Sequence, residues 1–134
     1  MATVLVDSNV LLDILIPDPR WEEWSSATLA TVAESSLLAI NPIIYAEVSI
    51  GFDRIEDLEA ALPKELRREA LPWDSAFLAG KAFLGYKRHG GARTSTLPDF
   101  FIGAHASIRG YTLLTRDPRR YRTYFPTLNL MAPE

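Results

Sequence analysis

Four acidic residues carry the strongest chemical signal in this 134-residue sequence. Asp7 directly follows the apolar run "VLV", and Asp117 lies just past the run "YTLLT". Asp99 lies in the first turn of an apolar helical segment, and Glu47 interrupts the segment "PIIYAEVSIG". Carboxylates that converge repel one another by about 4 kcal/mol per pair, at a separation of about 4 Å and an effective dielectric constant of about 20. Such a group needs shared protons or a bound cation, and its all-oxygen ligands suit the hard ions Mg²⁺ and Mn²⁺.

Three of these acids also have ordinary structural explanations when each is taken alone. Asp7 could cap the helix that follows it, and Asp99 could simply complement a helix dipole. Asp117 precedes Pro118 and could form a turn. The prediction of a metal site therefore depends on all four acids lying together.

Glu47 is harder to explain as an isolated residue. Ile43 and Ile44 lie four and three positions before it, so they share its face of a helix that we expect to be buried. A buried carboxylate is costly unless it is paired, protonated or bound to a metal. Its partner is therefore either the other acids around a cation or an arginine, with Arg93 and Arg116 as candidates.

The charge distribution is compatible with a phosphate-rich ligand. Residues 1–80 carry 5 Lys and Arg against 14 Asp and Glu, whereas residues 81–134 carry 9 against 3. Hard divalent ions at carboxylate clusters mostly serve phosphate chemistry, because they lower the pKa of a bound water and stabilise charge on the attacked phosphorus. Basic residues of the second half could hold a phosphate backbone, although a solvated basic face explains them equally well. The candidates for RNA contacts are Lys87, Arg88, Arg93, Arg116, Arg119 and Arg120.

Short apolar runs alternate with helical segments along the whole chain. We expect strands at Thr3–Val6, Leu37–Ile40, Glu69–Leu71 and Tyr111–Leu114, and in the run "TLNLM". We expect helices at Val10–Ile16, at Trp21–Glu34, from Pro42 with a continuation through "RIEDLEAALP", from Asp74 or Ser75 to His89, and at Pro98–Arg109. This alternation predicts an α/β fold with a mostly parallel sheet. Ligands of such sheets bind beyond the carboxyl ends of the strands, where Asp7 and Asp117 are expected.

Composition excludes several other classes of protein. The hydrophobic share of 48% indicates a globular chain, and the absence of cysteine excludes a disulfide framework and thiolate metal sites. No apolar run reaches the roughly 18 residues of a membrane span, and the start "MATVLVDSNV" lacks the basic region of a signal peptide. We expect a single cytoplasmic domain over residues 1–134.

Four segments together resemble a known family. The segments are "VLVDSNVLLDIL", "IYAEVSIGF", "LPDFFIGAHA" and "LLTRDPRRY", and they occur in the order expected of the PIN domain, specifically of the VapC-type toxins of toxin–antitoxin pairs. The resemblance implies a three-layer α/β/α sandwich around a mainly parallel sheet of about five strands. It also implies Mg²⁺- or Mn²⁺-dependent endonucleolytic cleavage of RNA. The implied partners are a second copy of the chain and an antitoxin that inserts into the active-site groove.

The resemblance also assigns roles to individual residues. Asp7, Glu47, Asp99 and Asp117 fall on the acidic tetrad of the family. Asp7 and Asp99 are then the most direct metal ligands, and the other two complete the shell, directly or through water. Thr115 falls on a hydroxyl position that orients Asp7, and Asn9 on a polar position beside the metal pocket. Ser8 stands where the family commonly has threonine.

Three other functions stay open from the residues. A phosphatase or phosphotransferase could use Asp7 as its nucleophile, although such enzymes usually have a second acid where this chain has Asn9. A phospho-accepting signalling domain would have a lysine after a late strand, and the lysines here are only at 64, 81 and 87. A non-catalytic PIN-like interaction module is the remaining alternative. A trapped phospho-aspartate would favour the phosphatase, and a lack of metal binding would favour the module.

Two groups of aromatic and histidine residues lie outside the acidic set. His105 lies six positions after Asp99, about 240° around the helix, so the two side chains do not share a face and we expect His105 to be structural or exposed. Tyr121 is expected to pack in the interior. Trp21 and Trp24 fit the core, or alternatively an apolar groove that receives an antitoxin helix.

Overall fold

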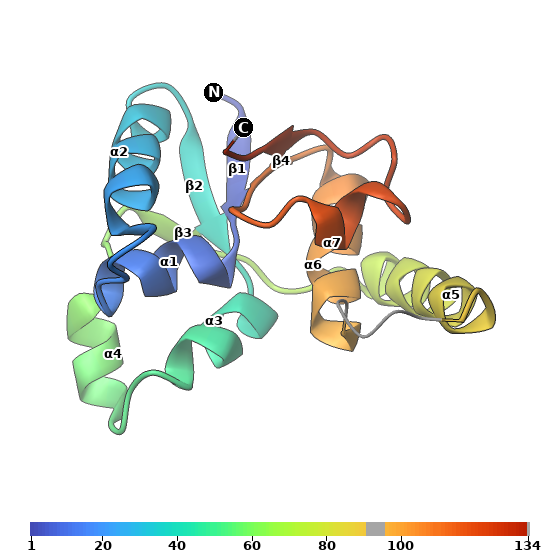
Figure 1. Cartoon of the computed structure of the whole chain (residues 1–134), viewed down its shortest axis with the longest axis horizontal. Coiled ribbons are helices and arrows are strands. Elements are labelled where there is room, and N and C mark those ends of the chain that lie inside the picture. The colour runs from blue at the N-terminus through green and yellow to red at the C-terminus, as the bar shows by residue number, and fades with distance from the viewer. Residues whose placement is uncertain (91–95, 134) are drawn as a thin grey trace.

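A five-stranded parallel sheet lies at the centre of the chain in a computed structural model that describes residues 1–90 and 96–133 (Figure 1). Its strands are β1 (Thr3–Val6), β2 (Leu37–Ile40), β3 (Leu66–Arg68), β4 (Thr112–Leu114) and β5 (Leu130–Met131). They are ordered β3-β2-β1-β4-β5, and every neighbouring pair is parallel. The predicted parallel sheet of about five strands is confirmed.

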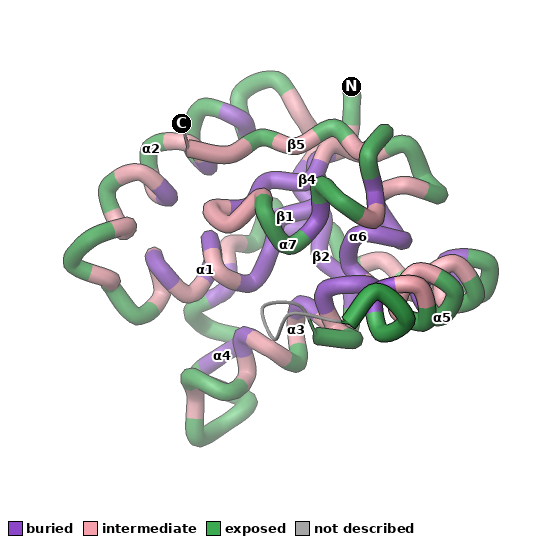
Figure 2. The backbone as a smooth tube through the Cα atoms, turned by 45° about the vertical axis from the view of Figure 1, so that its right-hand side comes forward, coloured by how far each residue is buried: buried purple, intermediate pink, exposed green. Residues whose placement is uncertain are grey.

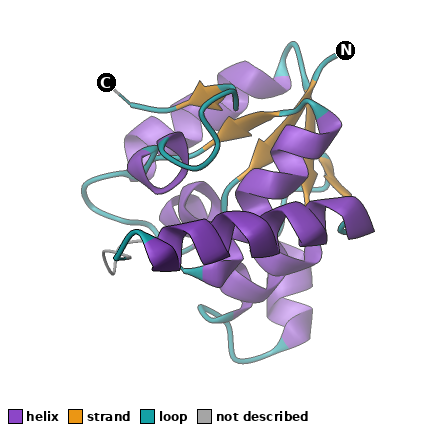
Figure 3. Cartoon of the chain, turned by 90° about the vertical axis from the view of Figure 1, so that its right-hand side faces the viewer, coloured by secondary structure: helices purple, strands orange, loops and turns teal. Residues whose placement is uncertain are grey.

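Helices cover both faces of this sheet. They are α1 (Ser8–Leu15), α2 (Glu22–Ala33), α3 (Pro42–Ser49), α4 (Ile55–Ala61), α5 (Trp73–Arg88), α6 (Leu97–Arg109) and α7 (Arg119–Arg122). Helices α1 and α2 pack together on one side, and α5 and α6 pack together on the other (Figures 1 and 3). The fold is therefore the expected three-layer α/β/α sandwich. No helix in the described part of the chain is long and apolar enough to span a membrane.

The core lies along strands β1 and β4 and helix α6 (Figure 2). Leu5, Val6, Leu113 and Leu114 are fully buried, because a parallel sheet with helices on both faces has no solvent-facing side. Tyr121 of α7 is also fully buried, as predicted for a packing residue. This packing fixes the carboxyl ends of β1 and β4, from which the candidate site is built.

Two helix starts follow from their capping residues. The Asn41 side chain accepts a hydrogen bond from the Ile44 backbone N–H at 2.9 Å, and Pro42 occupies the first turn of α3, as predicted. Thr96 and Asp99 form a capping box at the start of α6, so the helix begins at Leu97. Gly110 ends α6 with a φ of 69°, a conformation that suits glycine.

The predicted position of the third strand is wrong by three residues. The strand is Leu66–Arg68 rather than Glu69–Leu71, and it pairs with β2 at the edge of the sheet. Only Leu66 of its three residues is buried, so the apolar signal of a central strand is missing. The Glu69 backbone N–H adds one further bond to the Ile40 carbonyl at 2.9 Å, after which the chain leaves the sheet.

The expected continuation of the α3 helix is also wrong. The chain leaves the helix after Ser49 and begins a separate helix at Ile55. Gly51 lies between them and packs so closely on Ile16 that a Cβ atom at this position would collide with it. Ile50 is 86% exposed, so the apolar segment around Glu47 is buried on one face only.

Candidate active site

The candidate site lies where the strand order of the sheet changes direction. Strands β2 and β3 lie on one side of β1, and β4 and β5 lie on the other. Asp7 follows β1 and Thr115 follows β4, and the Asp7 backbone N–H donates to the Leu114 carbonyl at 2.9 Å. The crevice at such a switch point is where open α/β sheets bind ligands.

Asp7 is a buried carboxylate that accepts several hydrogen bonds. Its side chain is 3% exposed, and it accepts from the Ser8 N–H at 2.8 Å and from the Tyr121 hydroxyl at 2.7 Å. Burial raises the pKa of Asp7, whereas the hydrogen bonds from Tyr121, Thr115 and Ser8 lower it, and the charge of Asp99 raises it again. The net effect is a raised pKa, so the ionised form of Asp7 is less stable here than it would be in water. That the Thr115 hydroxyl orients Asp7 for metal binding stays a prediction.

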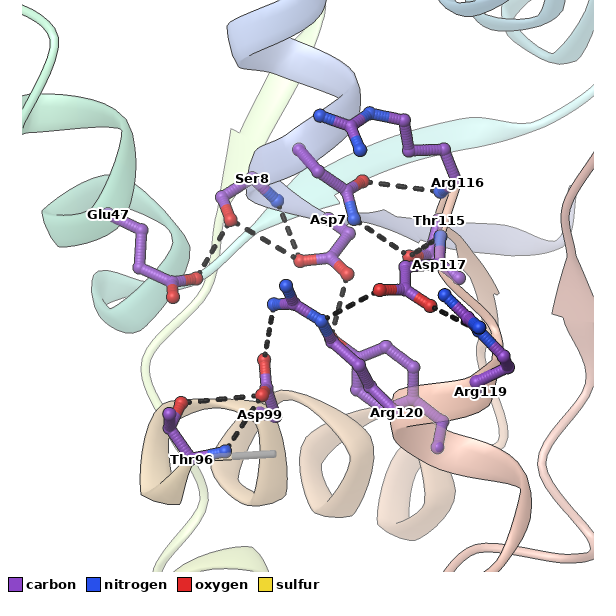
Figure 4. Close-up of polar contacts among 12 residues, drawn as sticks. Asp7, Ser8, Glu47, Thr96, Asp99, Thr115, Arg116, Asp117, Arg119 and Arg120 are labelled. Atoms are coloured by element: carbon purple, nitrogen blue, oxygen red, sulfur yellow. Dashed lines mark hydrogen bonds and ion pairs between the residues drawn. The ribbon is translucent and has the colours of Figure 1, made fainter. Parts of the chain in front are cut away.

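Glu47 faces the same crevice from helix α3 (Figure 4). The Ser8 hydroxyl donates to its Oε1 atom at 2.8 Å and so links Glu47 to the turn that carries Asp7. Partial burial raises the pKa of Glu47, the Ser8 bond lowers it, and the charges of Asp7 and Asp99 raise it. Glu47 therefore lies within electrostatic reach of both other acids.

Of the two arginine partners considered for Glu47, Arg116 does not account for it. The Arg116 guanidinium bonds to Asp13 instead, with Nε 2.8 Å from Oδ2. Arg93 lies outside the described residues. The charge of Arg120 does lower the pKa of Glu47, but less than any of the other causes.

Asp99 serves the helix and the crevice at once. Its Oδ2 atom accepts from the Thr96 N–H at 3.0 Å, which is the capping role, and its side chain is almost fully buried. Its Oδ1 atom points to the other acids and lies 3.5 Å from Nη1 of Arg120 (Figure 4). The structural and the chemical explanations of Asp99 are therefore compatible, because each uses a different oxygen.

Asp117 is connected to Asp99 through the guanidinium of Arg120. Its carboxylate accepts from Nε of Arg120 at 3.0 Å and lies 3.5 Å from Nε of Arg119. Its backbone N–H donates to the Thr115 hydroxyl at 3.1 Å, which fixes the turn after β4. Three of the four predicted acids thus act directly on one another, and the fourth lies across a guanidinium from Asp99.

The donor chemistry of this site fits a hard divalent cation, but the present arrangement is closed by Arg120. Within residues 1–90 and 96–133, no three Asp, Glu or His side chains are placed to hold a metal ion as they stand. The Arg120 guanidinium lies between Asp99 and Asp117 (Figure 4). Burial is the largest cause of the raised pKa of Asp7 and of Glu47, and the charges of neighbouring carboxylates raise both further. A bound divalent cation would stabilise the ionised forms of these carboxylates.

A second polar layer supports the turn after β4. Asn9 donates from Nδ2 to the Thr115 hydroxyl at 3.1 Å, and its Oδ1 accepts from the Arg116 N–H at 3.3 Å. Asp13 is 2% exposed and accepts from the Ser25 hydroxyl at 2.7 Å as well as from Arg116. Helix α1 and the segment 115–117 are therefore held together by polar bonds.

Sequence reasoning missed three of these contributors. Asp13 carried a signal like that of Glu47, a lone acid within the apolar run "LLDIL", which predicts a buried partner. Ser8 bonds to both Asp7 and Glu47, and Tyr121 bonds to Asp7 through a hydroxyl that sequence patterns cannot place. His105 is buried as a structural residue, with Nδ1 2.9 Å from Nδ2 of Asn41.

The six candidate RNA contacts have different surroundings. Lys87 and Arg88 are exposed at the end of α5, and Arg119 is 90% exposed despite its contact with Asp117. Arg116 and Arg120 are engaged with carboxylates. Arg93 falls in the segment that the structure does not describe.

The fold and the site together define an α/β/α protein with acidic residues at the switch point of a parallel sheet. Residues 4–126 match the PIN domain, and the chain belongs to that family. A search of curated proteins finds no match.

Solved structures with the same fold come from several bacteria. VapBC2 of Rickettsia felis, bound to a DNA fragment from its promoter, has a TM-score of 0.75 at 19% identity, covering 97% of this chain and 98% of that one. FitAB bound to the IR36 DNA fragment has a TM-score of 0.72 at 21% identity, covering 97% and 94%. The sarcin–ricin-loop-cleaving toxin VapC20 of Mycobacterium tuberculosis has a TM-score of 0.58 at 17% identity, covering 81% and 85%.

Proposed function

We propose that this chain is an endoribonuclease that depends on Mg²⁺ or Mn²⁺ and acts as the toxin of a toxin–antitoxin pair. The observation that carries the proposal is the convergence of Asp7, Glu47 and Asp99 at the switch point of a PIN fold, where the carboxylates act on one another electrostatically. The similarity to VapBC and FitAB complexes, and to a toxin described as cleaving the sarcin–ricin loop, supports it.

Asp7 and Asp99 would hold the metal most directly, and Glu47 and Asp117 would complete its shell. A bound divalent ion supplies a water of lowered pKa and stabilises charge on the attacked phosphodiester. The Tyr121, Thr115 and Ser8 donors keep the Asp7 carboxylate oriented and favour its ionised form, which is the form that binds a cation.

The proposal includes partners and a location. The chain would act as one nuclease domain over residues 1–134, in the cytoplasm, as a homodimer that a cognate antitoxin silences. Lys87, Arg88 and Arg119 are the candidates with exposed cationic groups for the phosphates of an RNA substrate.

RNA cleavage in the presence and absence of metal tests the proposal. Purified protein is incubated with total cellular RNA in Mg²⁺, in Mn²⁺ and in excess chelator. We expect discrete fragments with 5′-phosphate ends in either metal and intact RNA with chelator, because the proposed attacking water is activated by the bound metal. Cleavage that persists in chelator, or an aspartyl phosphate trapped on Asp7, would contradict the proposal.

The pH dependence of metal binding tests the role of the Tyr121 hydroxyl. This hydroxyl lowers the pKa of Asp7 against the larger effect of burial, so Tyr121→Phe should raise that pKa further. A carboxylate binds the metal only when deprotonated, so affinity rises as the pH rises through this pKa. We therefore expect the rise in Mn²⁺ affinity, measured by calorimetry from mildly acidic to neutral pH, to move to higher pH in the variant.

Tyr124→Phe is the matched control for this experiment. Tyr124 belongs to the same segment and packs its ring on Tyr86 and Phe100. Its variant should keep the pH profile of the parent chain. An unchanged profile in Tyr121→Phe would show that this hydroxyl has no role in holding Asp7 ionised.

A further inference from the structure

One cation of the chain itself, Arg120, lies in the acidic crevice, which is the site formed by Asp7, Glu47, Asp99 and Asp117. The Arg120 side chain bonds to Asp117 through Nε at 3.0 Å and approaches Asp99 through Nη1 at 3.5 Å. These two acids come from different elements, the start of α6 and the turn after β4. The guanidinium therefore bridges two of the four residues that the proposed function assigns to the metal.

The Arg120 guanidinium interacts with two carboxylates at once, because its Nε and Nη1 atoms reach oxygens of two different acids, Asp117 and Asp99. Arg119 provides a contrast on the same helix, because among the described residues its ion pair is with Asp117 only, at 3.5 Å, and its side chain is 90% exposed. Arg120 is 41% exposed, so its head group can leave the crevice without unpacking the core.

We propose that Arg120 is a built-in counter-cation that holds the acidic crevice closed until a divalent ion displaces it from Asp99 and Asp117. Resting on the proposed function, this inference adds a competition: the same oxygens serve the guanidinium in the metal-free chain and the metal in the active one. A guanidinium has donors only and cannot coordinate a metal, so the two cations compete for the same oxygens, Oδ1 of Asp99 and Oδ2 of Asp117. Metal affinity is thus set partly by the ion pair that must be broken.

Metal titration of the full chain tests this competition without reference to catalysis. Metal-free wild type, Arg120→Gln and Arg119→Gln are titrated with Mn²⁺ by calorimetry. We expect Arg120→Gln to bind Mn²⁺ about tenfold more tightly than wild type, equivalent to about 1.4 kcal/mol. Arg119→Gln removes the same charge from the same neighbourhood but not the bridge, and should change the affinity far less. Arg120→Lys keeps the charge without the planar fork and should give an intermediate affinity.

Thermal melts of the same proteins give a second readout. In chelator, Arg120→Gln should melt at a lower temperature than Arg119→Gln, because its acids have lost their counter-cation. Saturating Mn²⁺ should remove this difference. The melts also establish that each variant is folded.

The outcomes separate this inference from the proposed function. Equal or weaker Mn²⁺ binding by folded Arg120→Gln, with wild type binding normally, would overturn the competition and leave the nuclease proposal standing. If neither folded wild type nor folded Arg120→Gln binds Mn²⁺, both the competition and the proposed metal-dependent nuclease are overturned.

Discussion

Replacing Asp99 with asparagine is expected to remove RNA cleavage while the chain stays folded. The change keeps the shape of the side chain but removes the charge of a residue proposed to contact the metal directly. Loss of a residue that merely supports a metal ligand already costs about 10- to 100-fold in affinity or activity, so we expect a loss of at least about 100-fold here. Cleavage of total RNA in saturating Mg²⁺ is the measurement.

The fold should tolerate this substitution because of how Asp99 is bonded. Its helix-capping bond comes from the Thr96 N–H, and an asparagine oxygen can accept the same bond. The free energy of unfolding should therefore fall by no more than about 1 kcal/mol. Calorimetry should show weakened Mn²⁺ binding in parallel with the lost activity.

Asp74→Asn is the matched control, because Asp74 is also a first-turn acid, on the neighbouring helix α5. It is exposed and bonds to the Ser75 N–H at 3.0 Å, outside the acidic crevice. Its variant should cleave RNA like the parent chain. Full activity in folded, metal-saturated Asp99→Asn would exclude Asp99 from the metal site.

The fold could be predicted because its signals are local. Strands Thr3–Val6 and Leu37–Ile40 lie where the apolar runs predict them, since both are buried on two faces. The Asn41 cap and the Gly110 stop also follow from local rules. The edge strand at Leu66–Arg68 was misplaced because an exposed edge has little apolar patterning to detect.

The acids of the candidate site could be selected from the sequence, but their arrangement could not. Strand order alone places Asp7 near the turn that holds Asp117, and a lone acid in an apolar helix pointed to Glu47. The sequence gives no sign that Arg120, one of several cations in its segment, is the one that enters the crevice. Nor does it show that the Tyr121 hydroxyl reaches Asp7 across 114 residues. Such contacts depend on tertiary packing rather than on spacing.

The second large effect is expected from breaking the Asp13–Arg116 ion pair. Replacing Arg116 with methionine leaves the Asp13 charge buried, and among the described residues the Ser25 hydroxyl, at 2.7 Å, is then its remaining side-chain donor. Removing one partner of a buried pair typically costs 3–5 kcal/mol, and we expect about 3 kcal/mol because Arg116 is itself 30% exposed. Urea unfolding measures this loss.

Two further variants isolate the pair. Arg119→Met removes an arginine that is 90% exposed and should change the free energy of unfolding by no more than about 0.5 kcal/mol. Adding Asp13→Asn to Arg116→Met removes the uncompensated charge and should restore part of the stability. A loss below about 1 kcal/mol in Arg116→Met would mean that the Asp13 charge does not need this partner.

The same pair should also matter for catalysis, because of what it joins. Asp13 lies on α1, the helix that begins directly after Asp7, and Arg116 lies between Thr115 and Asp117. Breaking the pair frees the turn after β4 to move relative to Asp7, and metal sites require their ligands to be held within about 0.5 Å. At a temperature where Arg116→Met is fully folded, its cleavage rate should therefore still be lower than that of the parent chain. Activity equal to the parent's under those conditions would assign the pair to stability alone.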